Sequence, residues 1–370
     1  MFLALLVFVA VAGASAAVVA LILRLAHSKA WYDRVDERKA HEGDVPRLGG
    51  LGFVPVFIVA SSVIMFSTGQ ERQFAAFLPV VAGAFAMSFF GVWDDFRPLR
   101  PALKLLIQIG AALCVVISGY HLQRLAFFDG NVLQRLPLLA SCLTVLWIVG
   151  MSNAVNLIDG VDSLAGGVSL IAAATFAYIF YRYSGMHLSV MVCVALAGSV
   201  AGFLVFNAPF PRAKIFMGDG GSQFLGFILA VLPLLKGSTA GIQNPGTALP
   251  LLHIAAILSI PILDTISAVW RRTREKRPVS SPDKEHTHHK LMNLGLSHRQ
   301  IVAVMLGLQL AVSFLTVLSF EANSASSGLM SMLVLGAAYF IVIAFFTTLH
   351  FMNRKRMKAA SPQNPNQGKA

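Results

Sequence analysis

The sequence predicts an all-α, polytopic integral membrane protein with about eleven transmembrane helices and its polar site on the cytoplasmic face. Of the 370 residues, 56% are hydrophobic and only 12% are charged, which excludes an ordinary soluble enzyme and a disordered chain. Apolar runs long enough to span a bilayer recur along the whole chain. Lys and Arg gather in alternate loops between these runs, which is typical of cytoplasmic loops in membrane proteins.

The expected helices are apolar runs separated by short polar segments. They cover residues 2–24, 51–68, 75–93, 102–119, 136–152, 164–182, 187–207, 222–236, 247–270, 300–319 and 329–350. The runs 136–152 and 222–236 are short enough to be tilted or partly re-entrant. The first run has no basic segment before it and continues past a cleavage-like Ala-Ser-Ala, so we expect a retained helix rather than a signal peptide. Residues 1–350 thus form one transmembrane domain.

Charge sets the expected orientation of these helices. Most basic residues fall on one side, in loops 25–50, 94–101, 153–163, 208–221 and 271–299 and in the tail 351–370. By the positive-inside rule this side is cytoplasmic and the N-terminus lies outside. The net charge of +12 is therefore explained by topology, without nucleic acid as a partner. The tail is expected to be disordered and basic enough to touch anionic lipid.

One polar stretch, NAVNLIDGVDSLAGG at 153–167, interrupts the apolar sequence. Asn153, Asn156, Asp159 and Asp162 follow one another at steps of three residues, and Gly160 allows a sharp turn. Carboxylates near a bilayer usually have a ligand, a metal or a water-filled cleft beside them. A helix-capping turn is the alternative, but capping needs only one or two such residues.

Two further clusters contain carboxylates at the expected cytoplasmic ends of helices. Asp94 and Asp95 are adjacent, which suits either a divalent cation or a proton acceptor beside a metal ligand. Lys104 follows in the next helix, where it would meet a phosphate. In FMGDGGSQFLG, Asp219 stands among glycines before an apolar helix, an arrangement that offers backbone N–H groups to phosphate. A plain N-cap is the alternative for Asp219.

Two clusters are basic. DRVDERKAHEGDVPRLGG at 33–50 combines His41 and Arg47 with a Gly-Gly pair, which suits a diphosphate; an ordinary positive-inside loop is the alternative. The segment RRTREKRPVSSPDKEHTHHKLMNLG at 271–295 contains a group of three histidines, His286, His288 and His289. Zinc binding is disfavoured because the surroundings are cationic and no cysteine is near. Anion recognition fits better than zinc, and a solvated basic loop would leave the histidines unexplained.

Together, five carboxylates and a basic histidine loop lie on one expected membrane face. Carboxylates with few soft ligands select Mg²⁺ or Mn²⁺. Such a cation among Lys, Arg and His is typical of sites that catalyse phosphoryl transfer. The apolar body of the protein predicts a lipid as one substrate. An anion transporter is the alternative class, but the acids gather at one face, no internal repeat is visible, and Asp264 is the only acid within a predicted helix.

In its sequence motifs the chain resembles the polyprenyl-phosphate N-acetylhexosamine-1-phosphate transferases. Five motifs carry the resemblance in order: RKAHEGDVPRLGG, DDFRPLRPALKLLIQ, NAVNLIDGVDSLAGG, FMGDGGSQFLG and PDKEHTHHKL. The resemblance implies a bacterial inner-membrane enzyme with a cytoplasmic site. It would transfer a sugar 1-phosphate from a UDP-sugar to undecaprenyl phosphate, release UMP and require Mg²⁺. The resemblance is compatible with a homodimer. It leaves open whether the lipid phosphate attacks the donor directly or whether a covalent enzyme intermediate forms.

The resemblance also implies residue roles. Asp94 would deprotonate the lipid phosphate, Asp95 and Asp219 would contact the metal, and Asp159 and Asp162 would be essential acids, with Asp162 as a further metal ligand. Lys104 would meet a phosphate, Asn153 and Asn156 would line the nucleotide-sugar site, and His286, His288 and His289 would recognise the donor.

Two segments of the sequence indicate the branch of this family to which the chain is most similar. VPRLGG and HTHHKL differ from the corresponding segments of the phospho-MurNAc-pentapeptide branch of peptidoglycan synthesis, which remains the alternative. Both favour the branch that uses UDP-GlcNAc to start O-antigen of lipopolysaccharide, enterobacterial antigen, teichoic acid or related glycans. Val35 replaces an expected proline, and Ser163 stands where the family has glycine, which bears on the turn or on the preferred hexosamine.

Overall fold

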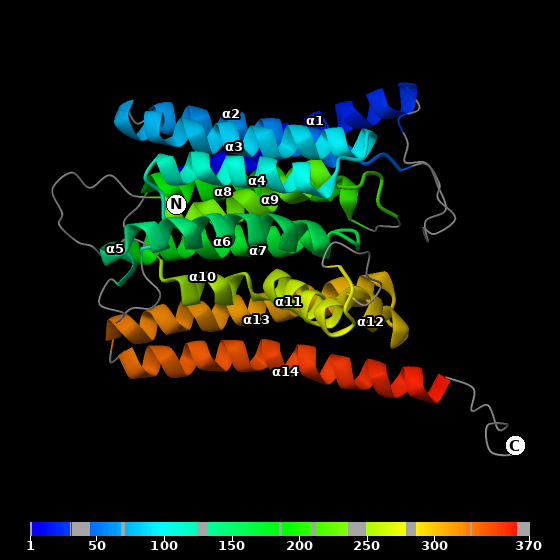
Figure 1. Cartoon of the computed structure of the whole chain (residues 1–370). Coiled ribbons are helices and arrows are strands. Elements are labelled where there is room, and N and C mark those ends of the chain that lie inside the picture. Colours follow the sequence, from blue (N-terminus) through cyan, green and yellow to red (C-terminus); the bar gives the residue numbers. More distant parts are fainter. Residues whose placement is uncertain are drawn as a thin grey trace, which may run out of the picture.

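The computed structural model describes residues 2–29, 31, 45–67, 71–123, 132–184, 187–208, 212–235, 249–278, 286–325 and 328–360. Throughout these ranges the regular elements are helices, which confirms the all-α class. Figure 1 shows the long helices running side by side, with α14 along one edge of the bundle and α2 and α3 along the opposite edge.

The elements in chain order are α1 (Phe2–Lys29), α2 (Gly49–Ser67), α3 (Glu71–Phe96), α4 (Pro101–Ile117), α5 (Val132–Arg135), α6 (Pro137–Ile158), α7 (Leu164–Ile179), η1 (Phe180–Ser184), α8 (His187–Asn207), α9 (Asp219–Val231), η2 (Leu232–Leu234), α10 (Leu251–Ile257), α11 (Ser259–Arg274), α12 (Thr287–Asn293), α13 (His298–Ala325) and α14 (Gly328–Ala360).

Eight helical segments in the described part of the chain are long and apolar enough to cross a membrane, and α10 with α11 would make a ninth. Each predicted apolar run coincides with a helix or with this bent pair. The runs 102–119 and 222–236 correspond to shorter apolar helices, α4 and the segment Asp219–Leu234. The chain is therefore a multi-pass membrane protein.

Two predicted helix ends were wrong. The run 136–152 is not short, because α6 continues to Ile158 and takes Asn153 and Asn156 into the helix. Helix α14 continues through Ala360, ten residues into the segment expected to be a disordered tail. In both cases polar residues follow the apolar run without a helix-breaking Pro or Gly, so the helix continues past the edge of hydropathy.

The run 247–270 is not one straight span, because α10 and α11 meet at an angle of 86°. The cause is Pro261, which has no N–H to donate to the carbonyl group of Ile257 four residues earlier. The amide of Gln309 on α13 donates to this freed carbonyl at 2.8 Å. The break is thus satisfied from a neighbouring helix, as buried backbone in a membrane requires.

Helix α9 lies at the centre of the bundle, since every residue from Gly220 to Val231 is buried. The rings of Phe53 and Phe57 on α2 pack against Phe224 with centroids 5.9 and 5.5 Å apart. Helices α1 and α8 approach closely through small residues, because a Cβ on Gly198 would lie 2.8 Å from the carbonyl oxygen of Phe8. This packing fixes the end of α9 that carries Asp219.

We expect Gly202→Ala to destabilise the bundle, because the added Cβ would overlap the backbone carbonyl oxygen of Ala12 on α1. Overpacking of this kind costs about 1–3 kcal/mol. Gly13→Ala is the matched control on α1, since a Cβ there meets nothing within 4 Å and alanine favours the helix. The thermal midpoint of the detergent-solubilised protein should fall for the first variant and not for the second. Equal midpoints would contradict the close approach of α1 and α8.

Candidate active site

The predicted carboxylates meet around the first turn of α9. Asp219 begins this helix after Gly218, which has a φ of 76° and no side chain with which to cap the helix. Asp95 at the end of α3 supplies the cap, accepting hydrogen bonds from the backbone N–H groups of Asp219 at 3.1 Å and Gly220 at 3.4 Å. Asp95 therefore joins two helices that lie far apart in sequence.

Gly218 is required at this junction. A Cβ at that position would lie 2.6 Å from the carbonyl oxygen of Arg47 and 2.7 Å from a carboxylate oxygen of Asp95. The positive φ also disfavours other residue types. The glycines of the FMGDGG motif thus allow the backbone before α2 and the end of α3 to reach the start of α9.

Lys104 on α4 bridges two of the carboxylates. Its ammonium group forms an ion pair with Asp94, and its Nζ lies 3.6 Å from Asp219 Oδ2. Asp94 also accepts a hydrogen bond from the backbone N–H of Leu99 at 2.6 Å. The lysine predicted to meet a phosphate thus stands between Asp94 and Asp219, where it offsets their repulsion.

The two predicted asparagines have different surroundings. Asn156 donates through Nδ2 to Asp219 Oδ1 at 3.2 Å and to the Ser222 hydroxyl at 2.9 Å. Asn153 instead pairs with Gln108 on α4, which lies 3.3 Å from Gln223 on α9. Only Asn156 lines the polar cavity. Gln108 and Gln223 were not predicted as site residues, although Gln108 is an isolated amide in an apolar run and Gln223 stands within FMGDGGSQFLG.

A polar cavity of about 190 Å³ opens beside this cluster. It contains three carboxylates and one cation and is lined by Arg47, Asn156, Asp159, Gly160, Val161, Asp162, Asn207, Phe216, Met217, Gly218 and Asp219. The structure therefore brings together Arg47, Asp159, Asp162 and Asp219, as predicted. His41 lies outside the described residues.

Carboxylate repulsion acts on Asp159. Burial raises the pKa of its carboxyl group well above the ordinary value, and the charges of Asp219, Asp95 and Asp162 raise it further, while Arg47 opposes them. The described residues contain no ready-made group of three carboxylate, imidazole or thiol ligands around one metal position. The donors in the cavity are nonetheless oxygen atoms with excess negative charge, which fits a hard cation that takes its remaining ligands from phosphate and water.

The turn that carries these acids runs from Asp159 to Ser163 and includes Gly160, as expected, but its left-handed residue is Ser163. Ser163 has a φ of 67°, a left-handed conformation that explains why glycine is expected there. Asn207 on α8 holds it, because the Ser163 N–H donates to Asn207 Oδ1 at 2.7 Å and the hydroxyl donates to the Asn207 carbonyl oxygen at 3.1 Å. Gly160 has another purpose: a Cβ there would lie 2.6 Å from the ring of His288.

The three histidines are brought to this turn, but none of them lines the polar cavity. His288 is buried, and its ring centroid lies 4.2 Å from that of His289. Burial first, and the neighbouring His289 second, lower the pKa of His288 to about 4. A lowered pKa favours the neutral form of His288 near pH 7, and the ring packs on Gly160.

Asp264 on α11 holds the histidine segment in place. Its Oδ2 lies 2.8 Å from Nδ1 of His286, and its Oδ1 accepts hydrogen bonds from the backbone N–H and the hydroxyl of Thr287. Asp264 is 3% exposed. The sequence marked it as an isolated acid in a predicted span, without indicating its partners.

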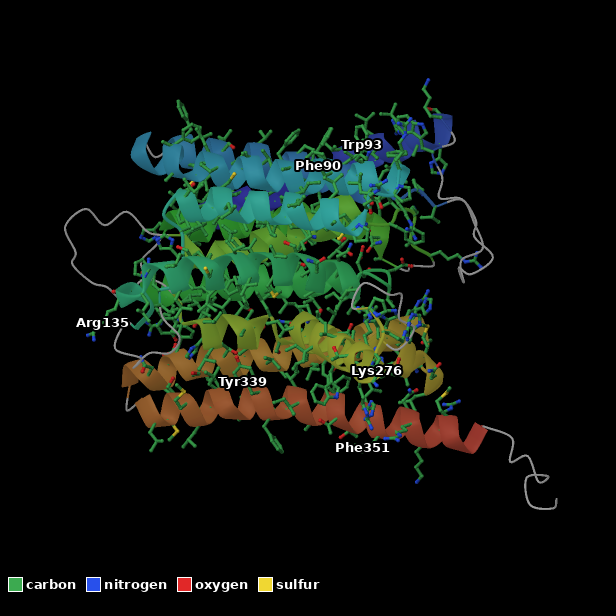
Figure 2. The ribbon with its side chains drawn as sticks, viewed as in Figure 1. Phe90, Trp93, Arg135, Lys276, Tyr339 and Phe351 are labelled. Atoms are coloured by element: carbon green, nitrogen blue, oxygen red, sulfur yellow. The ribbon has the colours of Figure 1, made fainter. Side chains whose placement is uncertain are left out.

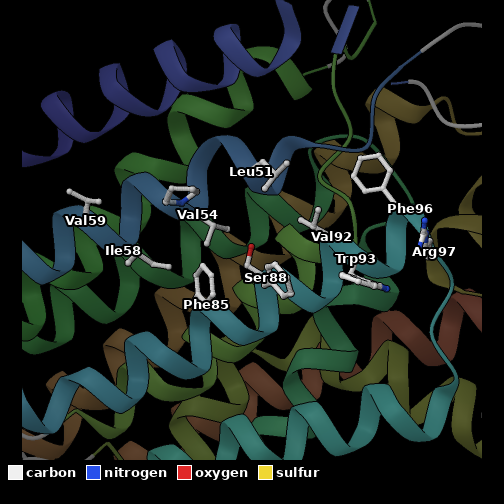
Figure 3. A pocket seen from close by; sticks show the side chains of 12 residues that line it. Leu51, Val54, Ile58, Val59, Phe85, Ser88, Val92, Trp93, Phe96 and Arg97 are labelled. Atoms are coloured by element: carbon white, nitrogen blue, oxygen red, sulfur yellow. The ribbon is translucent and has the colours of Figure 1, made fainter. Parts of the chain in front are cut away.

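An apolar groove of about 730 Å³ lies on the outer side of α2 and α3 (Figure 3). Val54 and Ile58 from α2 face Phe85 and Trp93 from α3 across it. Asp94 contacts α4 and Asp95 contacts α9, so the groove shares α3 with the site but none of its carboxylates.

Comparisons with known proteins give a consistent result. Residues 77–236 match the family described as glycosyl transferase family 4. The chain is 39% identical over 289 residues, covering 77% of this chain and 76% of the relative, to the probable undecaprenyl-phosphate N-acetylglucosaminyl 1-phosphate transferase of Bacillus subtilis (strain 168). It is 35% identical to the decaprenyl-phosphate N-acetylglucosaminephosphotransferase of Mycobacterium tuberculosis (strain H37Rv), covering 73% of this chain and 70% of the relative.

A more distant relative carries a similar name. The undecaprenyl-phosphate alpha-N-acetylglucosaminyl 1-phosphate transferase of Escherichia coli (strain K12) is 27% identical over 271 residues, which cover 72% of this chain and 71% of that protein.

We expect Asp159→Asn to raise the stability of the metal-free protein at neutral pH. A carboxyl group whose folded pKa is raised favours folding below its unfolded pKa and loses that contribution as the pH rises through the folded pKa. The amide removes this penalty, so the thermal midpoint should rise by roughly 2–4 °C at pH 7.5. The gain should shrink toward pH 4. Glu321→Gln, at the other end of the bundle, is the control, and an equal gain there would contradict the assignment.

Ser163 gives a second prediction at the same turn. Ser163→Gly relieves the left-handed strain of about 1–2 kcal/mol and loses one hydrogen bond worth about 1 kcal/mol, so its stability should stay near that of the parent. Ser163→Ala keeps the strain and loses the same bond, so it should melt lower than both. An alanine variant as stable as the glycine variant would show that the left-handed conformation is not maintained.

Proposed function

The chain belongs to glycosyl transferase family 4, and from this premise we propose that it transfers N-acetylglucosamine 1-phosphate from UDP-GlcNAc to undecaprenyl phosphate. The products are UMP and a lipid-diphosphate sugar that starts synthesis of a cell-surface glycan. The observation that carries the proposal is the convergence of Asp94, Asp95 and Asp219 with the acidic cavity at one end of an apolar bundle.

The cavity suits the diphosphate of the donor. Its volume of about 190 Å³ is below the roughly 300–1,000 Å³ of pockets that enclose whole drug-sized ligands. The diphosphate therefore enters the cavity while the uridine and the sugar lie outside it. Arg47 is the lining cation that would pair with phosphate oxygens.

Mg²⁺, with Mn²⁺ as a substitute, is the cation that we propose for this cavity. Asp219 and Asp162 would hold it, because both line the cavity. Asp95 is a poorer ligand than the sequence predicted, since both of its oxygens already cap α9. When bound, the cation would polarise the phosphoryl group and offset its developing charge. Mg²⁺ commonly uses one or two carboxylates together with substrate phosphates, which matches the donor set.

The chain's own residues would prepare the acceptor. Asp94 is the proposed base that takes the proton of the lipid phosphate, and Lys104 stays within reach of both Asp94 and Asp219 to attract the phosphate dianion. Asn156 holds Asp219 in orientation through its side-chain amide. Within the histidine segment, His288 would position the acidic turn through its contact with Gly160, and recognition of the donor by His286 and His289 stays a prediction.

The proposed setting follows from topology and from the relatives. The protein would lie in the bacterial inner membrane with its site and C-terminus in the cytoplasm and its N-terminus outside, because basic residues gather at that face. The names of the relatives support the GlcNAc branch and give no support to the pentapeptide donor or to an anion transporter. A homodimer stays a prediction.

The test is UMP release by purified protein supplied with undecaprenyl phosphate, Mg²⁺ and a panel of UDP-sugars. We expect release with UDP-GlcNAc that depends on both lipid and Mg²⁺, and none with UDP-MurNAc-pentapeptide. Asp94→Asn, Asp159→Asn and Asp219→Asn should each reduce turnover by at least 100-fold, in the range expected for removing a general base or an electrostatic stabiliser. Glu321→Gln should retain activity.

Full turnover in all three variants would refute the proposed roles of these acids. Release with the pentapeptide donor alone would move the enzyme to the other branch. The thermal midpoint of Asp159→Asn, expected to be at least that of the parent, is measured alongside, so that loss of activity in a variant with an undiminished midpoint is not due to unfolding.

A further inference from the structure

A second polar feature lies away from the acidic cavity, in a groove of about 710 Å³ where α11 and α12 meet α14. It is at the same end of the bundle as the candidate active site. Figure 2 shows Phe351 on α14 and Lys276 just after α11 toward this end, with Arg135 at the opposite end. The groove shares no lining residue with the acidic cavity.

The lining changes from apolar to cationic along both long helices. On α11, Ile266 and Trp270 are followed by Arg271 and Arg274. On α14, Phe346 and Phe351 are followed by Arg354. Because α14 runs toward this end of the bundle (Figure 1), its apolar residues Phe346 and Phe351 precede Arg354 on the way to the end of the bundle where the candidate active site lies.

Charge in the groove is strongly unbalanced. Among the residues that the structure describes, its lining includes four cationic side chains, Arg271, Arg274, Lys290 and Arg354, and one carboxylate, Glu275. The apolar side chains are open to the surroundings, since Trp270 is 71% exposed and Phe351 is 63% exposed. Guanidinium groups match phosphate in shape and charge, and tryptophan favours the boundary between hydrocarbon and water.

The apolar groove between α2 and α3 provides a contrast. It has a similar volume, about 730 Å³, but of the described residues that line it Arg97 alone is charged. Hydrocarbon chains of any lipid would fit there, and nothing in it distinguishes one headgroup from another. The groove at α14 has the additional feature that selects a ligand, a cluster of cations at the headgroup level.

We propose that the groove formed by α11, α12 and α14 binds one anionic phospholipid from the leaflet at this membrane face. Its phosphate would lie among Arg271, Arg274 and Arg354, and its acyl chains would follow Trp270 and Phe346. This ligand is a component of the bilayer and is distinct from the substrates of the acidic cavity. It would brace α11, the helix whose Asp264 holds the histidine segment.

The test compares lipid binding to delipidated protein by native mass spectrometry in detergent, with phosphatidylglycerol and phosphatidylcholine as probes. One phosphatidylglycerol should bind more tightly than phosphatidylcholine. Arg274→Gln combined with Arg354→Gln should weaken its binding roughly thirtyfold, as expected from the loss of two cations near an anionic headgroup. Arg24→Gln removes an exposed arginine at the end of α1 and should leave binding unchanged.

A second variant keeps the charges and fills the groove. Thr347 lines it from α14 and is exposed, so Thr347→Trp should also abolish the tight site, even if the double arginine variant fails to fold. Equal binding of the two lipids, or unchanged binding in Thr347→Trp, would overturn the proposal. A third outcome would also overturn the proposal. If the lipid-free protein has the mass of a dimer and Thr347→Trp has the mass of a monomer, the groove binds a second copy of the chain.

Discussion

The capping of α9 by Asp95 is the interaction on which the site depends. A helix N-terminus leaves several backbone N–H groups without intrahelical partners, and in this chain Gly218 offers no side chain to satisfy them. Asp95 supplies the acceptor from α3, more than one hundred residues earlier in the sequence. The same contact fixes Asp219 beside Lys104 and Asp94. Asp95 thus has a structural role as the cap of α9, and this cap places Asp94 and Asp219 where they can take part in the chemistry.

Whereas Asp95 stabilises the fold, the carboxylates of the acidic cavity repel one another. Asp159, Asp162 and Asp219 share one small space with a single cation, Arg47, in its lining, and the pKa of Asp159 is raised as a result. Such repulsion weakens the folded state and is retained only where a ligand relieves it. A bound divalent cation would offset the excess negative charge that these carboxylates leave beside Arg47, and would so allow an anionic diphosphate to approach. The stability expected from Asp159→Asn and its expected loss of turnover therefore have the same physical origin.

The sequence predicted the class, the apolar runs and the acids that converge, because hydropathy and charge are local properties of the chain. It could not predict which carboxylate would cap a helix, since Asp94 and Asp95 are neighbours with identical chemistry and only the rotation of α3 separates their partners. Gly160 and Ser163 show the same limit. The turn occurs at the glycine as expected, but the left-handed residue within it is the serine, because Asn207 on α8 holds it there.

The broken helix explains why a carboxylate occurs inside an apolar run at all. A straight helix through 247–270 would place Asp264 among hydrocarbon, where an ionised group is unfavourable. Pro261 breaks the helix, Gln309 satisfies the freed carbonyl of Ile257, and α11 turns through 86°. Asp264 then reaches Thr287 and His286, which satisfy its oxygens. The bend therefore anchors the histidine segment to the membrane domain, and the ring of His288 is pressed against Gly160 in the acidic turn.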